Sequence, residues 1–146
     1  MEPGTGDPDA SGMTTDDTAR NKQLVDTFIQ ELFSKGDLDA VDRYLDPDFV
    51  HHDPPVPGAP DGPEGFRYAA AMVRRACPDW HSELHQLVGF TAGGTHRAEL
   101  LGVAATGNTL TLPGINIFRV RGDMIVERWG CVDLAGLMHQ LGLIPG

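Results

Sequence analysis

The spacing of apolar residues changes once along this chain, near residue 80, and this change limits the possible folds more than any other feature. Before it, the apolar residues of 24–33 and 66–76 recur every three to four positions, which is typical of helices with one buried face. After it, residues 80–90, 95–103, 109–120 and 124–133 are rich in β-branched and apolar types and are separated by glycine-bearing turns. Helices followed by strands predict an α+β fold, in which the helices pack on one face of a largely antiparallel sheet.

Glycine and proline mark the boundaries of the expected helices. The Lys35-Gly36 pair suits the end of the first helix, and a short second helix over 38–45 ends before Pro47. Pro63 is placed to begin a third helix, because the first turn does not need the N–H that proline lacks. The five prolines between Asp53 and Pro63 exclude both a helix and a central strand, so we expect a loop there.

Tight turns divide the second half into strands. Gly93-Gly94, Gly107-Asn108 and Arg121-Gly122-Asp123 lie between the expected strands and predict antiparallel hairpins. A short helix over 134–143 closes the chain. We therefore expect a single domain over residues 18–146, preceded by a disordered acidic tail over residues 1–17.

The charge and composition exclude several classes of protein. The net charge of −10 argues against binding to nucleic-acid phosphates and to anionic membranes. No apolar run approaches the roughly 20 residues of a membrane-spanning helix, and the acidic start does not resemble a secretory signal. The two cysteines, Cys77 and Cys131, form neither a disulfide framework nor a metal-binding pair. These features predict a cytoplasmic protein with no nucleic-acid or membrane partner.

The chemistry-bearing motifs of common enzymes are missing. The sequence has no glycine-rich phosphate loop, no HExxH metalloprotease motif and no GxSxG serine-hydrolase motif. The first remaining candidate is the extended segment 48–52, in which His51 and His52 point to opposite faces, so that only one can face an interior. A metal site with Asp53 is disfavoured because adjacent ligands in a strand diverge, and the alternative is a histidine that hydrogen-bonds to the loop.

Two polar residues stand among apolar neighbours in the expected strands. His96 shares a face with Ala98 and Leu100, and it is either a buried core histidine or a catalytic one. Asn116 lies on an apolar face of the longest strand with Gly114 two residues before it. A buried amide must find partners or line a polar cavity, and Gly114 leaves space for one.

The last strand carries two carboxylates whose location depends on its regularity. If no bulge intervenes, Ile125, Glu127, Trp129 and Asp133 share one face, and the two apolar residues indicate that this face points inward. Burial would then raise the pKa of both carboxylates towards a range suited to acid/base catalysis. The alternative is that Glu127 pairs with an arginine at the sheet surface.

Three segments together resemble a known family. GPEGFRYAAAMVRRACPDW, THRAELLGVAATG and GINIFRVRGDMIVERWGCVDLAGLMHQLG follow one another as do the motifs of the SnoaL-like polyketide cyclases, within the nuclear-transport-factor-two-like superfamily. The resemblance covers about residues 23–142. It implies a cone-shaped α+β barrel with three helices around a curved sheet and one deep pocket. It also implies a homodimer or larger homo-oligomer that needs no metal or other cofactor for cyclisation.

The resemblance also assigns roles by position. His52, His96 and Asn116 match polar pocket positions, and the essential aspartate of the family falls at Gly130 or is replaced by Asp133. The expected catalytic residues are Asp133, His96 and Asn116. The expected substrate-binding residues are His52, Trp129, Glu127, Phe118 and Phe28.

These roles suit acid/base cyclisation of a polyketide by an intramolecular aldol reaction. Asp133 would act as acid/base, while His96 and Asn116 would hydrogen-bond the substrate carbonyl as it gains charge. One alternative is a cofactor-free hydroxylase of an aromatic polyketide, working beside a separate reductase. The other is a non-catalytic ligand-binding module, because this type of fold does not determine function.

Overall fold

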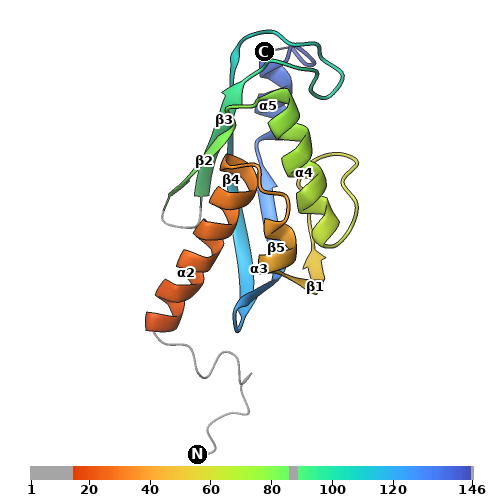
Figure 1. Ribbon diagram of the computed structural model, residues 1–146. Helices are drawn as coiled ribbons and strands as arrows, with labels where there is room; N and C mark the ends of the chain where they lie inside the picture. The colour runs from red at the N-terminus through yellow and green to blue at the C-terminus, as the bar shows by residue number, and fades with distance from the viewer. Residues whose placement is uncertain (1–14, 86–88, 146) are drawn as a thin grey trace, which may run out of the picture.

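The N-terminal helical segments cover one face of a sheet in the computed structural model, which describes residues 15–85 and 89–145 (Figure 1). The α+β architecture predicted from the spacing of apolar residues is confirmed. The helical elements are α2 (Thr15–Ile29), its π-helical continuation η1 (Gln30–Ser34), α3 (Ala40–Tyr44), α4 (Pro63–Ala76) and the short C-terminal α5 (Leu134–Gln140). Helix α2 begins within the segment predicted as a tail, and residues 1–14 of that tail lie outside the described residues.

The predicted apolar faces of α2 and α4 meet in the core. Phe28 of α2 is fully buried and lies edge-to-face with Phe66 of α4, with the ring centroids 5.4 Å apart. Burying side chains of this size contributes roughly 1.5–3 kcal/mol each. Pro63 occupies the first turn of α4, as predicted, and follows Gly62, whose φ of 73° suits glycine. The helical half of the fold therefore follows from local sequence signals.

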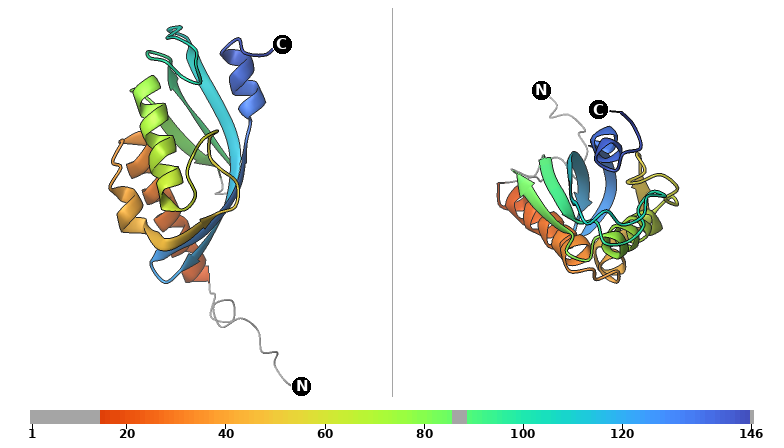
Figure 2. Two further views of the ribbon diagram at one scale, coloured as in Figure 1. Left: turned by 90° about the vertical axis from the view of Figure 1, so that its right-hand side faces the viewer. Right: turned by 90° about the horizontal axis from the view of Figure 1, so that it is seen from above.

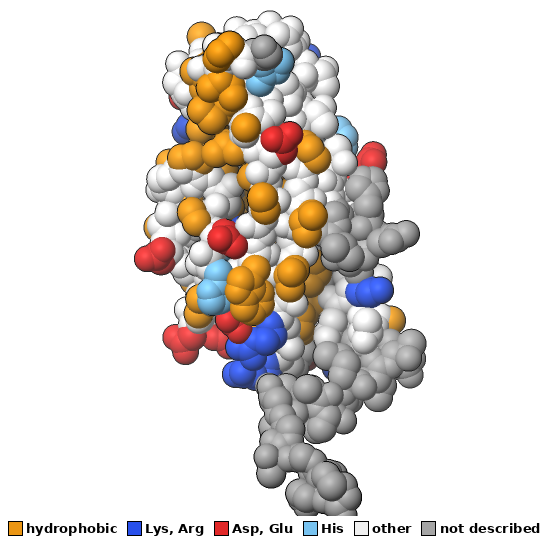
Figure 3. All heavy atoms as spheres, turned by 180° about the vertical axis from the view of Figure 1, so that it is seen from behind, with side chains coloured by type: hydrophobic (Ala, Val, Ile, Leu, Met, Phe, Trp, Pro, Cys, Tyr) orange, Lys and Arg blue, Asp and Glu red, His pale blue; other side chains and the backbone are white. Residues whose placement is uncertain are grey.

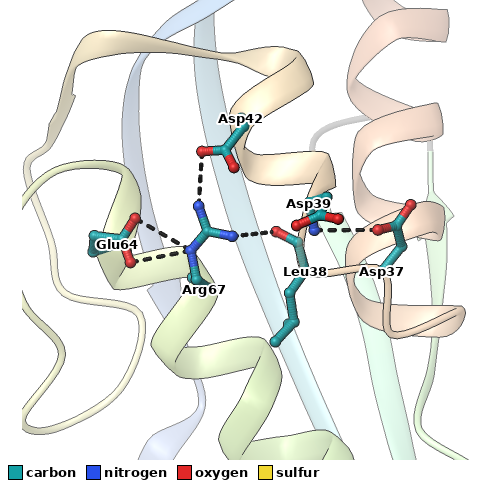
Figure 4. A network of polar contacts seen from close by, with 6 residues as sticks. All are labelled: Asp37, Leu38, Asp39, Asp42, Glu64 and Arg67. Carbon is teal, nitrogen blue, oxygen red and sulfur yellow. Dashed lines mark hydrogen bonds and ion pairs between the residues drawn. The ribbon is translucent and has the colours of Figure 1, made fainter.

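Arg67 connects α3 with α4 (Figure 4). Its guanidinium donates to the carbonyl oxygen of Leu38 at 2.8 Å, to Asp42 at 2.7 Å and to Glu64 at 3.0 Å. The two helices are thereby held against each other at one end of the sheet, next to the strand that follows α3.

The sheet has five strands in the order β1-β5-β4-β3-β2, and it curves around the helices (Figure 2). The strands are β1 (Leu45–His51), β2 (His81–His85), β3 (Gly89–Thr95), β4 (Thr109–Arg121) and β5 (Met124–Val132). The predicted antiparallel pairing is confirmed for β2 to β5, whereas β1 pairs in parallel with β5. This pairing places the start of the proline-rich loop beside β5.

The predicted turn at Gly93-Gly94 is wrong, because both glycines lie inside β3. A Cβ at Gly93 would overlap the carbonyl oxygen of Leu110, and one at Gly94 would lie 2.9 Å from the Cβ of Cys77. These glycines therefore permit close packing of backbone instead of a turn. The strand expected over 95–103 is wrong as well, because β3 ends at Thr95 and only an isolated bridge follows, between Leu100 and Val103.

A β-bulge reverses the predicted faces of the last strand. Arg119 pairs with Glu127 while the next residue of β4, Val120, pairs with Ile125, so that Val126 is an extra residue in β5. Ile125 and Arg128 are consequently both buried, whereas Trp129 is exposed. The inward face predicted for Glu127 and Trp129 is therefore wrong beyond the bulge.

Candidate functional site

A largely apolar cavity lies between the helices and the sheet. It encloses about 730 Å³, its open mouth included, and α2, α4, β2 to β5 and the proline-rich loop contribute to its walls. Aromatic and aliphatic side chains such as Phe66, Phe90 and Leu112 form most of the lining. Among the described residues, the polar side chains in its wall are Ser82, Asn116 and Arg128, and no Asp, Glu or His lines it.

Arg128 forms the polar end of the cavity and is only 3% exposed. Its Nε and Nη2 donate to the Oδ1 of Asn116 at 2.8 and 2.5 Å. Its Nη1 donates to the carbonyl oxygen of Asp53 at 2.9 Å and lies 3.1 Å from the Nε2 of His51. The guanidinium is thus held in one orientation by β4, β1 and the loop, as a preformed donor group.

The charge of Arg128 has no directly bound counterion among the described residues. No carboxylate among the described side chains, those of residues 18–84 and 90–145, lies within 4 Å of the guanidinium. Burial lowers the pKa of Arg128 to about 10, a change that the more distant carboxylate of Asp53 opposes. The group therefore stays protonated at neutral pH, and the cavity has a positively charged end.

His51 supports Arg128 as a neutral hydrogen-bond acceptor. A guanidinium can only donate, so the Nε2 of His51 accepts from it and the imidazole proton lies on Nδ1, which is buried without a partner. Burial, and secondarily the charge of Arg128, lower the pKa of His51 to about 4. The ring also packs on Phe66, with centroids 4.5 Å apart. His51 is therefore the histidine of the pair that faces the interior.

Gly130 leaves the space that the guanidinium fills. A Cβ at this position would overlap the Nη2 and Cζ of Arg128 and lie 2.6 Å from the Oδ1 of Asn116. The backbone N–H of Gly130 donates to the carboxylate of Asp53 at 3.0 Å, which ties the loop to β5. Gly130 is one of the two positions predicted for the family aspartate, and here a cation occupies the space that a side chain there would take.

Of the eight predicted site residues, the structure places Asn116 and Phe118 in the wall of the cavity. Phe28 is fully buried in the core behind the wall. His96 is also fully buried, below the loop that follows β3, where its Nδ1 lies 2.9 Å from the Oγ1 of Thr106. Neither Phe28 nor His96 lines the cavity, so the structure does not bring His96 and Asn116 together.

Three further predicted residues lie together on the outer face of the sheet. The ring of His52 stacks on Trp129 with centroids 4.5 Å apart, and its Nε2 is 2.7 Å from Glu127. Glu127 also accepts from Arg119, so the alternative of a surface arginine pair is the one observed. Trp129 is exposed beside its strand partner Ile117, on a face that shows several hydrophobic side chains (Figure 3).

Asp133 follows the end of β5 and is exposed. Its carboxylate accepts from the backbone N–H of Gly136 at 2.8 Å and thereby caps the N-terminus of α5. It does not line the cavity. The catalytic role expected for Asp133 stays a prediction from the resemblance, and its observed contact is structural.

Arg128 was not predicted as a site residue, and His52 was chosen in place of His51. The signal for His51 was present, since only one histidine of the pair can face inward, but the sequence does not say which one does. The signal for Arg128 was hidden by the bulge at Val126, which shifts it to the buried face. The glycine two residues later is the remaining clue, because it frees space beside Arg128.

Two features of other protein classes are absent from the residues that the structure describes. No group of three or more His, Cys, Asp or Glu side chains is arranged to hold a metal ion in this part of the chain. No helix within the same residues is both long enough and apolar enough to cross a bilayer.

Comparisons with known proteins agree with this fold. TsrD from Streptomyces laurentii is 28% identical, with a TM-score of 0.73 over 86% of this chain and 97% of that one. IdmH from Streptomyces antibioticus, a candidate polyketide cyclase, is 28% identical, with a TM-score of 0.65 over 82% and 99% of the two chains. AclR from Streptomyces galilaeus, a candidate hydroxylase, is 21% identical with a TM-score of 0.74 over 88% of each chain, a likeness in fold alone.

No curated protein matches the sequence. The sequence model of the SnoaL-like polyketide cyclases, in contrast, matches residues 23–141, from the third turn of α2 to the residue after α5. Because this match spans every element that surrounds the cavity, the chain belongs to the SnoaL-like polyketide cyclase family.

Proposed function

We propose that this protein is an enzyme that closes a ring in a polyketide-type substrate by an intramolecular aldol reaction. The observation that carries the proposal is the buried guanidinium of Arg128, held by Asn116 at the end of an otherwise apolar cavity. Apolar walls suit the carbon chain of a folded polyketide, and a fixed donor suits an oxygen atom that gains charge during the reaction.

The reaction would use Arg128 to stabilise an enolate. A C–H bond between two carbonyl groups of the substrate breaks, its proton passes to water, and the electron pair moves onto the oxygen beside the guanidinium. The enolate carbon then attacks a ketone carbon of the same chain, a C–C bond forms, and the resulting alkoxide takes a proton from water. The walls of the cavity would bring the two carbons together, which is an orientation effect.

In this reaction no protein side chain acts as the base, and the protein contributes the positive charge of Arg128 instead. No carboxylate or imidazole lines the cavity among the described residues, so proton transfer to water at the open mouth fits the geometry better than transfer to Asp133 or His96. A guanidinium near the carbonyl oxygen favours the enolate and thereby lowers the pKa of the substrate C–H group. Asn116 keeps the role expected for it only in part, because its Oδ1 is occupied by Arg128.

The test is ring closure of a synthetic aryl-capped triketone, followed by the absorbance of the cyclised product. Wild-type protein should accelerate closure, and Arg128→Gln should lose on the order of a hundredfold in rate. The matched control is Arg119→Gln, which removes an arginine of the outer face and should leave the rate unchanged. Equal rates with and without protein, for this substrate and for longer poly-β-ketones, would contradict the proposal.

A hydroxylase is the second candidate, and the lack of a carboxylate in the cavity wall favours it. Such an enzyme would bind a reduced aromatic polyketide as its anion. This anion reacts directly with oxygen, so the enzyme needs a group that stabilises the anion more than it needs a base. Comparing product formation under air and under nitrogen separates the two reactions, because only hydroxylation consumes oxygen. A non-catalytic ligand-binding module would bind ligands in this cavity but change neither reaction.

The homodimer implied by the resemblance would use the outer face of the sheet. Ile115, Ile117 and Trp129 are 51%, 59% and 37% exposed there, and exposed apolar side chains that cluster on one face mark protein contacts. Light scattering of the wild type and of Ile117→Glu tests this assignment. A dimer that becomes monomeric in the variant supports it, whereas a dimer that is unaffected assigns the contact to another face.

A further inference from the structure

We propose that the cavity selects a ligand that is already an anion, namely an apolar, ring-bearing molecule with one oxyanion that binds at Arg128. This inference rests on the proposed function of the cavity and narrows its substrate class. A neutral ketone would leave the guanidinium charge uncompensated until it loses its C–H proton, whereas a carboxylate, an acidic phenolate or a stable enolate would neutralise it on binding.

The first argument is that Arg128 lacks the carboxylate partner that three more exposed arginines have. Arg43, Arg67 and Arg119 each lie within 3.0 Å of a carboxylate, and all three side chains are partly exposed. Arg128 is the most buried of the four, and its partners are an amide oxygen, a backbone carbonyl oxygen and a neutral imidazole. Buried charges in proteins are normally paired, so a site with this arrangement is completed by an anion from outside.

The second argument is that Asp53 is engaged elsewhere. Its carboxylate accepts from the N–H of Gly130 at 3.0 Å, while only its backbone carbonyl oxygen contacts Arg128. The carboxylate of Asp53 therefore weakens the positive potential at Arg128 without forming an ion pair with it. His51 adds no charge of its own at neutral pH, because its pKa is about 4.

The third argument is that the guanidinium retains a free donor. Of its five N–H groups, Nε uses one, Nη1 uses two and Nη2 uses one in bonds to described residues. The second N–H of Nη2 has no acceptor among the described side chains and backbone groups. Because Arg128 lines the cavity, this donor is available to a bound oxyanion.

The walls define the rest of the ligand. The ring of Phe66 lies below the guanidinium, 5.7 Å from its Cζ, and Phe90 and Phe118 extend the aromatic wall. Gly114 leaves room for Phe90, since a Cβ there would lie 2.5 Å from the Cζ of that ring. A flat aromatic or polycyclic body with its oxyanion at one edge fits these neighbours better than a flexible aliphatic acid does.

The test uses a ring-matched pair of probes, 2-naphthoate and 2-naphthamide, titrated calorimetrically at pH 7 into the full chain. The carboxylate should bind about tenfold or more tightly than the amide, and added salt should weaken only the carboxylate. Arg128→Gln should abolish this preference while retaining binding of the amide, and Arg128→Lys should retain part of it. The control Arg119→Gln should leave both affinities unchanged.

A second variant tests the same contact in case Arg128→Gln does not fold. Gly130→Ala keeps the guanidinium but displaces it, because the added Cβ would overlap its Nη2, and it should reduce the preference for the carboxylate. Equal affinity for the two probes, no binding of either at its solubility limit, or an equal loss in Arg119→Gln would overturn the inference. Ring closure is a separate readout: a preference for naphthoate without any ring closure would leave the inference standing and reject the proposed reaction.

Discussion

Two clusters, each with one arginine and one histidine, lie on opposite sides of β5. On the inner side, Arg128 contacts Asn116 and His51, and on the outer side Arg119 contacts Glu127, which contacts His52. The two histidines are neighbours in sequence, and so are Glu127 and Arg128, the residues that β5 contributes to the two clusters. What differs is that the outer cluster contains a carboxylate and the inner one contains an amide.

Because of this difference, the two faces of β5 have different electrostatic properties. Outside, water screens the charges, and the arginine–glutamate–histidine group is a satisfied surface network of modest energy. Inside, a cation stays without a bound counterion where screening is weak, so it interacts strongly with any anion that enters. Substitutions that add or remove a carboxylate or a charge on either side of β5 test this difference.

The largest effect is expected from adding the missing carboxylate to the inner cluster by Asn116→Asp. The new carboxylate would pair with Arg128 through the two N–H groups that now bind the amide oxygen, and it would neutralise the anion site. We expect turnover of the triketone to fall by roughly a hundred- to a thousandfold. Denaturant unfolding should show a stability gain of about 1–2 kcal/mol. Unchanged turnover would contradict the role of Arg128 as an uncompensated cation.

The next largest effect is a loss of folding stability in acid, caused by the buried imidazole of His51. Its folded pKa of about 4 lies below its ordinary value of 6.5, so below pH 6.5 the unfolded chain binds a proton that the folded chain does not. The free energy of unfolding should therefore fall between about pH 6.5 and pH 4, by about 3 kcal/mol in total.

Comparison of urea unfolding curves at several pH values checks this prediction. His51→Gln, which keeps an acceptor for Arg128, should lose this part of the acid sensitivity. The matched variant His52→Gln, on the outer face, should retain it. Identical pH profiles for wild type and His51→Gln would reject the assignment of a buried neutral imidazole.

A smaller effect is expected at Asp133, beyond both clusters. Asp133→Ala removes the cap of α5 and should lower the free energy of unfolding by about 1 kcal/mol. Asp133→Asn can still accept from Gly136, so it should be nearly as stable as the wild type and turn over at a similar rate. The catalytic role expected from the resemblance makes the opposite prediction, a loss of about a hundredfold for Asp133→Asn, and one rate measurement separates the two.

The smallest effect is expected from removing the outer carboxylate by Glu127→Gln. The partners Arg119 and His52 are 41% and 37% exposed, so water and salt already weaken their ion pairs. We expect thermal unfolding to reveal a change of less than about 1 kcal/mol and the affinity for 2-naphthoate to stay constant. A large loss of affinity would mean that the two faces of β5 are coupled.

The sequence was sufficient for much of the fold. The apolar period predicted the helical faces of α2 and α4, Pro63 predicted the start of α4, and Arg121-Gly122-Asp123 predicted the turn before β5. Each of these rests on interactions between residues close in sequence, which is why spacing and turn residues are sufficient to find them.

The sequence was less informative where distant segments meet. Gly93 was interpreted as a turn residue because nothing local reveals that a carbonyl group from β4 approaches it. The parallel pairing of β1 with β5 joins segments more than seventy residues apart, and it decides that His51 faces the interior while His52 faces water.

The site itself shows the same division. Asn116 and Phe118 were found from strand alternation in β4, which is regular over their length. Arg128 was missed because one extra residue at Val126 reverses the faces of β5, and such a bulge leaves no clear sign in composition or hydropathy.

The sequence by itself therefore determined the helices, the strands, the polar residue Asn116 and the family, because these depend on local spacing and on the order of motifs. Only the tertiary structure decided which histidine faces the interior and which charged residue of β5 lines the cavity. The physical reason is that a strand has a side-chain period of two, so one inserted residue exchanges its two faces. That single exchange buries a guanidinium in place of a carboxylate, and it gives the cavity its positive charge.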